Sequence, residues 1–498
     1  MHDHKKMYGM IPAFLLFFCA GAFSAGGVDP SNPPPGVFFE QYYSIYLNNA
    51  KCGWSWYQIE RRKDQIHTRN TMLIKVGREG LVFQIDTRDE TTETVDGKPV
   101  GFRAERNISG SKTVFEGRFD GFSGLVKITA SGRTLEHQIT LRKDAVMVWG
   151  DLLRTRTFLG RPGGSFTSYV YTPQVDALKA IPMAVKVHGK ATLEIQGKTI
   201  KGIKTVTTAN DLGGFPIVSY FDDGGYVLAT ETRLGILNEL ILAVPKAEAI
   251  SGIQPEISLA NTYLALDKPL KLAPRGTMRY SITSTSKEPV PEFPDTGMQK
   301  VLERRPDRVL LAVTADPRER FPAGTPKPTA ANLASSSFAN LSDPLLIQLA
   351  DKAAGVEKDP ARLAAGLCDF VHDYIAEKNY ASAFNSASET ARSKSGDCSE
   401  HGVLLAALAR IKNIPSRVVS GLGYTEHGGP HGSFGYHMWT QLWVNDRWTD
   451  FDSAFGQSEP DPTHIAFATV DLAEDTFFKQ AARFAAFVGH LKITPVEK

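Results

Sequence analysis

Hydrophobic and polar residues alternate along the first half of the chain, in short runs separated by turn signals. A period of two is typical of strands that bury one face. Asp-Gly and Gln-Gly dipeptides between the runs suit tight turns. The pattern predicts an antiparallel, half-barrel-like, β-rich domain over residues 37–250. The clearest runs are Met72–Val76, Leu81–Thr87, Thr113–Phe119, Leu125–Ala130, Lys186–Ile195 and Tyr226–Thr230.

Helical spacing takes over in the last third of the chain. Leu345–Lys378 predicts helices, with Asp359 and Pro360 as the cap and first residue of the second one. Val403–Leu408 is apolar on nearly all sides, which predicts a central, buried helix that begins near Cys398.

Two runs rich in aromatic and β-branched residues follow, Tyr436–Val444 and Arg447–Asp452, and they predict a hairpin. Asn445-Asp446 suits a two-residue turn, so Val444 should face Arg447.

This register places Asp452 opposite Trp439 and diagonal to His437. Diagonal neighbours on one face lie about 7–8 Å apart at the backbone, within side-chain reach. Asp450 falls opposite Gln441, further from His437. Asp452 is therefore the predicted partner of His437.

A thiol, an imidazole and a carboxylate follow one another as Cys398, His437 and Asp452. They are the parts of a cysteine nucleophile with its base and its orienting group. A helix N-terminus lowers the pKa of a thiol, so we expect Cys398 to have a lowered pKa and to react fastest with iodoacetamide. The alternatives are a small buried cysteine and a structural, hydrogen-bonded histidine.

Taken together, these segments resemble the transglutaminase-like superfamily, with its papain-like Cys-His-Asp triad. The resemblance spans roughly residues 340–470 and implies that Cys398 is the nucleophile, His437 the general base and acid, and Asp452 the orienting group. The family includes cross-linking acyltransferases, peptidases, amidases and inactive members. The matching segments are Gly396-Asp-Cys398, Leu404-Leu405, Ala409-Arg410, Ile414-Pro-Ser-Arg-Val-Val419, His437-Met-Trp439 and Trp448 to Asp452.

The chain departs from the family pattern at two places near the predicted triad. Gln441 stands where the family often has Glu, and Ser453-Ala454 stands where it often has Pro-Thr. These changes affect supporting contacts more than the triad itself.

Composition and the N-terminal segment indicate which partners and which cellular location to expect. A net charge of +2 over 498 residues gives no reason to propose nucleic acid as a partner. A basic start and the apolar run Met10–Ala22 predict a signal peptide over residues 1–25, with an uncleaved anchor as the alternative. We therefore expect an exported protein, periplasmic or extracellular, that meets the membrane only through this segment.

Cysteine and histidine usage adds little further chemistry. Cys52 and Cys368 could pair, but burial without a partner is the expectation for both. The Gly-rich stretch with His427 and His431 is expected to be a mobile loop over the active site. We expect no cofactor and no metal.

The sequence thus predicts an α+β, exported protein of two main parts. The predicted divisions are a signal peptide (1–25), a Pro-rich spacer (26–36), the β-rich domain (37–250), connecting strands and linker (251–335), and a transglutaminase-like domain (336–498) in which a nucleophile helix packs on an antiparallel sheet. The predicted function is thiol-dependent acyl transfer on amide bonds of a protein or peptide substrate, by a peptidase, amidase or transglutaminase-type acyltransferase. The alternative is a non-catalytic peptide- or glycan-binding module.

Overall fold

The computed structural model describes residues 32–496 apart from 79–80, 131, 213, 235–236, 255–262, 274, 286–289, 317–325, 378–384, 428 and 474–489. The predicted signal peptide and Cys19 lie outside these residues. The chain divides into two compact units, one within residues 14–257 and the other within residues 258–498. Among the described residues, no helix combines the length and apolar character needed to cross a membrane.

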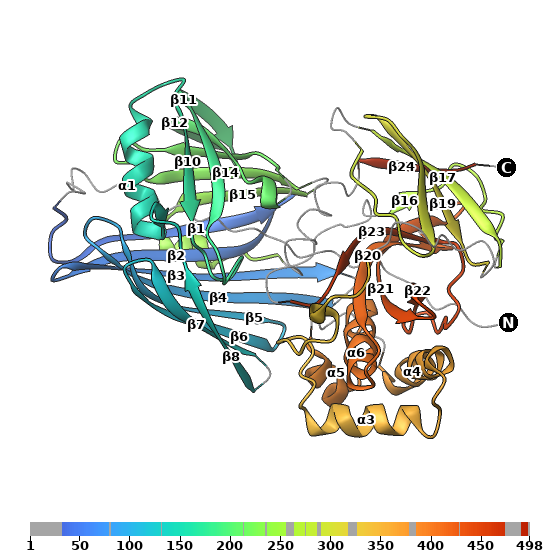
Figure 1. Ribbon diagram of the computed structural model, residues 1–498. Helices are drawn as coiled ribbons and strands as arrows, with labels where there is room; N and C mark the ends of the chain where they lie inside the picture. The colour runs from blue at the N-terminus through green and yellow to red at the C-terminus, as the bar shows by residue number, and fades with distance from the viewer. Residues whose placement is uncertain are drawn as a thin grey trace. The chain divides into compact units, whose positions relative to one another are not determined.

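The first unit, here called the β unit, is built on one large sheet (Figure 1). Fifteen described strands run in the order β8 to β1 and then β15 down to β9, so neighbours in sequence are nearly always neighbours in the sheet. All pairs are antiparallel except β9 with β10. The strands are β1 (Gly36–Leu47), β2 (Ala50–Arg62), β3 (Gln65–Arg78), β4 (Leu81–Thr94), β5 (Pro99–Ile108), β6 (Ser111–Asp120), β7 (Ser123–Ala130), β8 (Arg133–Thr140), β9 (Ala145–Val146), β10 (Ser165–Val170), β11 (Ile181–Ile195), β12 (Lys198–Thr208), β13 (Ile217–Phe221), β14 (Val227–Leu234) and β15 (Leu237–Val244).

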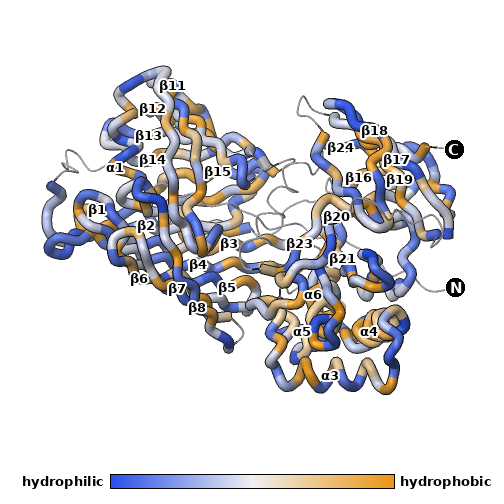
Figure 2. The backbone as a smooth tube through the Cα atoms, in the orientation of Figure 1, coloured by the Kyte–Doolittle hydropathy of each residue, from blue (hydrophilic) through white to orange (hydrophobic). Residues whose placement is uncertain are grey.

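The alternating runs and glycine turns of the sequence account for these strands. Each predicted run falls on a strand, and hydropathy alternates along the strands in Figure 2. Gly97, Gly121 and Gly197 adopt positive φ in the turns between strands, where glycine has no Cβ penalty. The large antiparallel sheet predicted for this half of the chain is confirmed.

The sheet curls, because one hydrophobic cluster joins its two ends. Phe102, Phe115 and Val126 from β5–β7 pack with Met147 and Tyr171, which flank the far edge of the sheet. Helix α1 (Val148–Leu159), which the sequence pattern did not predict, packs against β3 and β4 as well as β9–β11. A short second helix, α2 (Lys246–Ile250), contacts β1 and β2.

The start of α1 is capped by a carboxylate from another element. Met147 occupies the N-cap and has no side-chain cap bond. Glu93 of β4 accepts hydrogen bonds from the backbone N–H groups of Trp149 (2.7 Å) and Gly150 (2.9 Å) instead. Burial raises the pKa of Glu93 to about 7.

The second unit, here called the C-terminal unit, combines helices with two sheets (Figure 1). One sheet has the order β16-β21-β20-β23, with β22 paired to β21; the other has the order β18-β19-β17-β24. The protein is therefore α+β, with many strands and few helices. The elements are β16 (Leu264–Ala265), β17 (Thr277–Ser284), β18 (Gln299–Arg304), β19 (Arg308–Thr314), α3 (Pro344–Ala354), α4 (Pro360–Tyr374), α5 (Ala387–Ser393), α6 (Cys398–Ile411), β20 (Ser416–Thr425), β21 (Ser433–Val444), β22 (Arg447–Phe451), β23 (His464–Val470) and β24 (Leu491–Val496).

The segment expected to be connecting strands and linker belongs to this compact unit. Strand β17 pairs with β24 near the end of the chain as well as with β19. Val290 and Phe293, in the stretch expected to be a linker, are buried. Long-range strand pairing, rather than local pattern, orders this region.

Helix α6 is the centre of the C-terminal unit. Every residue from Ser399 to Arg410 is buried, and Figure 2 shows hydrophobic residues along the helix. Helices α3, α4 and α5 pack on it from one side and strands β20 and β21 from the other. The buried helix predicted from the apolar run is confirmed.

Candidate active site

Cys398 is the first residue of α6 and is partly buried as a residue. Asp397 is the N-cap, and its carboxylate accepts a hydrogen bond from the backbone N–H of Ser399 (2.8 Å). The backbone N–H of Met438 on β21 donates to the Cys398 sulfur. The thiol therefore lies beside the part of β21 that carries His437.

A buried pair of acidic residues stands next to the thiol. Glu400 accepts hydrogen bonds from the backbone N–H groups of Asp397 (3.0 Å) and Asn385 (2.9 Å). Burial and the charge of Asp397 raise the pKa of Glu400 well above its ordinary value. Asp397 and Glu400 together form a capping box at the start of α6.

The expectation that helix α6 would lower the pKa of the Cys398 thiol is wrong. Burial, followed by the charge of Asp397, raises this pKa well above the ordinary value, and the hydrogen bond from Met438 offsets only part of the rise. The thiol is therefore protonated at neutral pH in the free protein. An attack by this sulfur needs a base that removes its proton.

The hairpin has the predicted register. Val444 pairs with Arg447 and Gln441 with Asp450. Asn445 and Asp446 both adopt positive φ (52° and 57°), as the favoured two-residue hairpin turn requires. Asp452 follows the last paired residue of β22 and returns towards His437.

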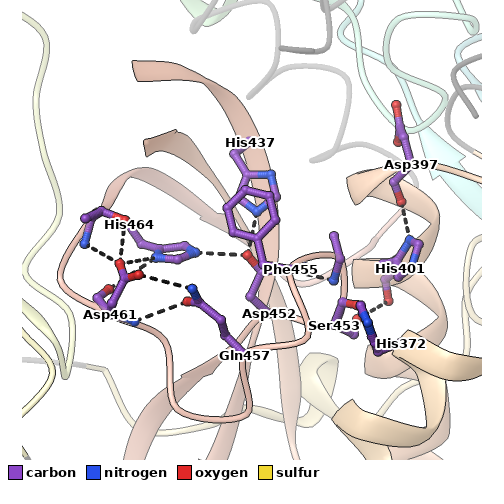
Figure 3. Close-up of polar contacts among 12 residues, drawn as sticks. His372, Asp397, His401, His437, Asp452, Ser453, Phe455, Gln457, Asp461 and His464 are labelled. Atoms are coloured by element: carbon purple, nitrogen blue, oxygen red, sulfur yellow. Dashed lines mark hydrogen bonds and ion pairs between the residues drawn. The ribbon is translucent and has the colours of Figure 1, made fainter. Parts of the chain in front are cut away.

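His437 and Asp452 form a buried hydrogen bond of 2.6 Å between Nε2 and Oδ2 (Figure 3). The His437 side chain is 1% exposed and the Asp452 side chain 0%. The other ring nitrogen, Nδ1 of His437, has no hydrogen-bond partner among the described residues. The imidazole is thus hydrogen-bonded through Nε2, and its Nδ1 remains available as an acceptor.

Asp452 accepts four hydrogen bonds. His437 and His464 donate to Oδ2, and the backbone N–H groups of Ala454 and Phe455 donate to Oδ1. Burial alone would raise the pKa of Asp452, but the charges and hydrogen bonds of both histidines hold it well below its ordinary value. Asp452 is ionised at every pH at which the protein would be assayed.

His464, the first residue of β23, is a site residue that the sequence did not indicate. Its Nε2 lies 2.9 Å from Asp452 Oδ2, and Asp461 accepts from Nδ1 through its backbone carbonyl (3.2 Å). Burial would lower the pKa of His464, but its hydrogen bonds to Asp452 and Asp461 raise it to about 10. His464 therefore carries a positive charge beside Asp452.

Aromatic rings fix the plane of the His437 imidazole. Phe455 stacks on it with ring centroids 4.1 Å apart and an interplanar angle of 9° (Figure 3). Trp439 lies further along the stack, with centroids 6.0 Å apart. Trp439 in turn packs on β20 at Gly421, where an added Cβ would come within 2.6 Å of the indole and closer still to the Ile465 carbonyl.

The two departures from the family pattern have clear structural roles. Gln441 donates to Asp450 (2.6 Å) and accepts from Arg417 (2.8 Å), so it ties Asp450 away from His437. Ser453 donates to the carbonyl of His401 (3.2 Å), which anchors the turn after Asp452 to α6. The predicted register already placed Gln441 opposite Asp450, whereas the contact of Ser453 with α6 joins elements that are distant in sequence.

The described residues offer one group of side chains that could hold a metal ion, formed by His437, Asp452 and His464. Both imidazoles already donate hydrogen bonds to Asp452 Oδ2, so a metal would have to displace both bonds. Hydrogen bonding therefore accounts for the cluster. His427 and His431 are not part of it.

The other two described cysteines are buried and unpaired, as expected. Burial raises the pKa of Cys52 to about 12 and that of Cys368 further. Cys398 is the most accessible thiol of the three.

Comparison with known proteins identifies the family of the C-terminal core. Residues 347–453 match the model of the transglutaminase-like superfamily, which confirms the transglutaminase-like core predicted from the sequence. The match contains Cys398, His437 and Asp452, and His464 lies beyond it. No curated protein matches the chain.

Solved structures resemble parts of the chain at low sequence identity. They include a candidate cysteine protease from Cytophaga hutchinsonii (16% identity, TM-score 0.30, covering 44% of this chain and 88% of that one). They also include a β-barrel-like protein of unknown function, of the DUF1849 family, from Brucella abortus (12%, 0.33, 41% and 95%). A DUF1089 family protein from Pseudomonas aeruginosa is a third (15%, 0.21, 35% and 87%).

Proposed function

We propose that the C-terminal unit is a thiol-dependent acyl-transfer enzyme that acts on amide bonds of proteins or peptides. One observation carries this proposal: Asp452 holds His437 through Nε2 at 2.6 Å, while Nδ1 has no hydrogen-bond partner among the described residues. A base that is oriented at one nitrogen and open at the other is the arrangement that thiol activation needs.

In the proposed reaction, the Cys398 sulfur attacks the amide carbonyl carbon while His437 Nδ1 takes the thiol proton. The oxyanion then collapses, the C–N bond breaks, and His437 gives the proton to the leaving amine. A thioester on Cys398 remains, and water or another amine resolves it. The backbone N–H of Cys398, at the start of α6, is the proposed oxyanion donor.

The raised pKa of Cys398 gives His437 its role in this scheme. Because the thiol is protonated at neutral pH, proton removal and attack have to occur together. The anionic Asp452 stabilises the imidazolium that forms, and Phe455 keeps the ring in plane.

We favour hydrolysis over transfer to an amine. Cys398 is only partly buried as a residue, which supports access of water to its thioester. A dedicated cross-linking enzyme has to exclude water from the acyl-enzyme. Partition of a model thioester-forming substrate between water and a primary amine measures this preference, and a dominant amine product would make the protein a transferase.

The test of the proposed activity is Cys398→Ala beside Cys368→Ala as a control at a buried cysteine. Cys398→Ala should lose turnover of a peptide-amide library by on the order of 10³-fold or more, and Cys368→Ala should keep it. If the wild-type protein binds peptides or glycans without turnover, the non-catalytic alternative holds instead.

Iodoacetamide labelling tests the state of the thiol. Cys398 should label before Cys52 and Cys368 because it is the most accessible of the three, and its labelling rate should still be rising above pH 9, its ordinary pKa. A rate that levels off below neutral pH would show a preformed thiolate and would overturn the proton-transfer step.

We also propose that the protein is exported and acts in the cell envelope. The apolar run Met10–Ala22 after a basic start supports this proposal. N-terminal sequencing of protein recovered outside the cytoplasm should find a new end near residue 25, whereas an intact Met1 would favour the anchor.

A further inference from the structure

A cavity of about 130 Å³ lies inside the β unit, remote in sequence from the candidate active site. Its wall comes from inward-facing residues of β2–β5 and of β11–β13, which the curl of the sheet brings face to face. One face of α1, with Val148, Asp151 and Thr155, completes the wall. These three residues recur at helical spacing, so a single stripe of the helix faces the cavity.

The charged groups in this wall are all carboxylates. Asp89 accepts a hydrogen bond from Gln174 (2.6 Å) and Asp151 accepts one from Ser168 (2.5 Å), and each uses only its Oδ1 in that bond. Among the described residues, the lining contains no Lys, Arg or His, although the charges of Arg106 and Arg154 act on Asp89 and Asp151, respectively. Burial raises the pKa of both carboxyl groups, that of Asp89 to about 6, so Asp89 is still ionised at neutral pH. A ligand in the cavity therefore meets carboxyl groups and no cation in the lining.

Two polar atoms in the wall also lack partners. Thr205 is 1% exposed, and its Oγ1 has no hydrogen-bond partner among the described residues. Asn70 Oδ1 likewise has no hydrogen-bond partner among the described residues. A buried polar atom without a partner is costly, and a carbonyl oxygen can be satisfied only by a donor. Asn70 on β3 pairs directly with Asp89 on β4. The β3–β4 wall of the cavity therefore presents two neighbouring hydrogen-bond acceptors.

The rest of the wall is apolar and limits the size of an occupant. Phe102, Met183, Val185, Ile217 and Phe221 line it. A dry engineered cavity of about 150 Å³ holds benzene, so about six to eight non-hydrogen atoms fit here.

We propose that this cavity binds a small primary amine in its ammonium form. The three N–H groups of the ammonium donate to Asp89, to Asp151 and to one of the two unpartnered oxygens, Asn70 Oδ1 or Thr205 Oγ1. A short hydrocarbon body packs on the apolar wall. This site is separate from the proposed acyl-transfer chemistry and stands whether or not that chemistry occurs.

Calorimetry on the full chain with hexylamine, hexan-1-ol and hexanoate tests the proposal, because the three probes share one body and differ in head group. Hexylamine should bind, with a Kd lower than that of hexanol by on the order of tenfold or more, and hexanoate should not bind. Equal binding of hexanol and hexylamine would overturn the assignment of an ammonium site.

Variants locate the binding. Asp151→Asn and, separately, Asp89→Asn should each weaken hexylamine binding by on the order of tenfold. Asp144→Asn, at an exposed position just before α1, should leave it unchanged. Thermal unfolding identifies the variants that fold. If both variants fold and keep full affinity, the amine does not bind here. If neither variant folds, Ala104→Leu, which fills the cavity, replaces them. Hexylamine binding by Ala104→Leu as tight as that of the wild type would also show that the amine does not bind here.

Discussion

Two buried carboxylates, one in each unit, show what decides whether an acid stays charged inside a protein. Asp452 is fully buried, accepts four hydrogen bonds and has a pKa held well below its ordinary value. Glu239 on β15 is 3% exposed, its Oε1 has no partner among the described residues, and burial raises its pKa to about 8. Equal burial has opposite results because the donors differ.

Glu93 lies between these extremes and shows which donors matter most. It accepts two backbone N–H groups and the Thr91 hydroxyl, yet its pKa is raised to about 7. Neutral donors therefore only reduce the effect of burial. Asp452 keeps its charge because two of its donors are imidazoles and one, His464, is positively charged.

The largest expected effect comes from neutralising the charged acid. Asp452→Asn should lower kcat/KM for peptide-amide cleavage by on the order of 10³–10⁴-fold, because the amide no longer orients and stabilises the imidazole. His437→Ala should remove nearly all activity. Asp450→Asn is the matched control on the same hairpin and should cost far less, because Asp450 bonds to Gln441 rather than to His437. A greater loss from Asp450→Asn would move the orienting role to that residue.

Glu239→Gln tests the uncharged acid through stability. The folded pKa of about 8 lies above the ordinary 4.5, so the neutral acid is favoured in the folded state. Below pH 4.5 Glu239 is neutral in both the folded and the unfolded protein and does not lower the free energy of unfolding. As pH rises from 4.5 to 8, Glu239 ionises in the unfolded protein first, so the free energy of unfolding should fall by on the order of a few kcal/mol in total.

Denaturant unfolding of the β unit between these pH values should therefore show a larger fall in the free energy of unfolding for the wild type than for Glu239→Gln, which keeps the smaller fall due to Glu93. Glu194→Gln, at an exposed position on β11, serves as the control and should retain the fall. Parallel pH profiles for the wild type and Glu239→Gln would mean that Glu239 is already ionised in the folded protein.

A smaller effect is expected from the charged donor itself. His464→Gln keeps a hydrogen-bond donor near Asp452 but removes the positive charge, and should reduce kcat by about 10–100-fold, in the range typical of supporting groups. A variant with lower stability and an unchanged kcat would limit His464 to a structural role.

Local sequence pattern was enough for the strands of the β unit, for the start of α4 and for the hairpin. The register followed from a two-residue turn, Asn445-Asp446, and the position of Asp452 followed from the register. Helix α6, beginning near Cys398, followed from the apolar run Val403–Leu408. Each of these features depends on residues close together in the sequence. The spacing of hydrophobic residues and the turn preferences of the sequence therefore indicate them.

What the sequence did not indicate depends on contacts between distant residues. Helix α1 has no local cap signal, since Glu93 of another strand supplies the cap. His464 reaches Asp452 only because the intervening turn folds back through the paired backbones of Asp452 and Gln457. The pKa of Cys398 was predicted from the helix alone, and burial reversed its direction.

The packing of Trp439 against Gly421 also leaves a mark that sequences of relatives can record. A methyl group at position 421 would collide with the indole and, more closely, with the backbone carbonyl of Ile465. A smaller residue at 439 would remove only the first collision, so a larger residue at 421 also requires strands β20 and β23 to separate. Among relatives that keep these two strands paired, glycine should therefore persist at 421 whichever residue stands at 439.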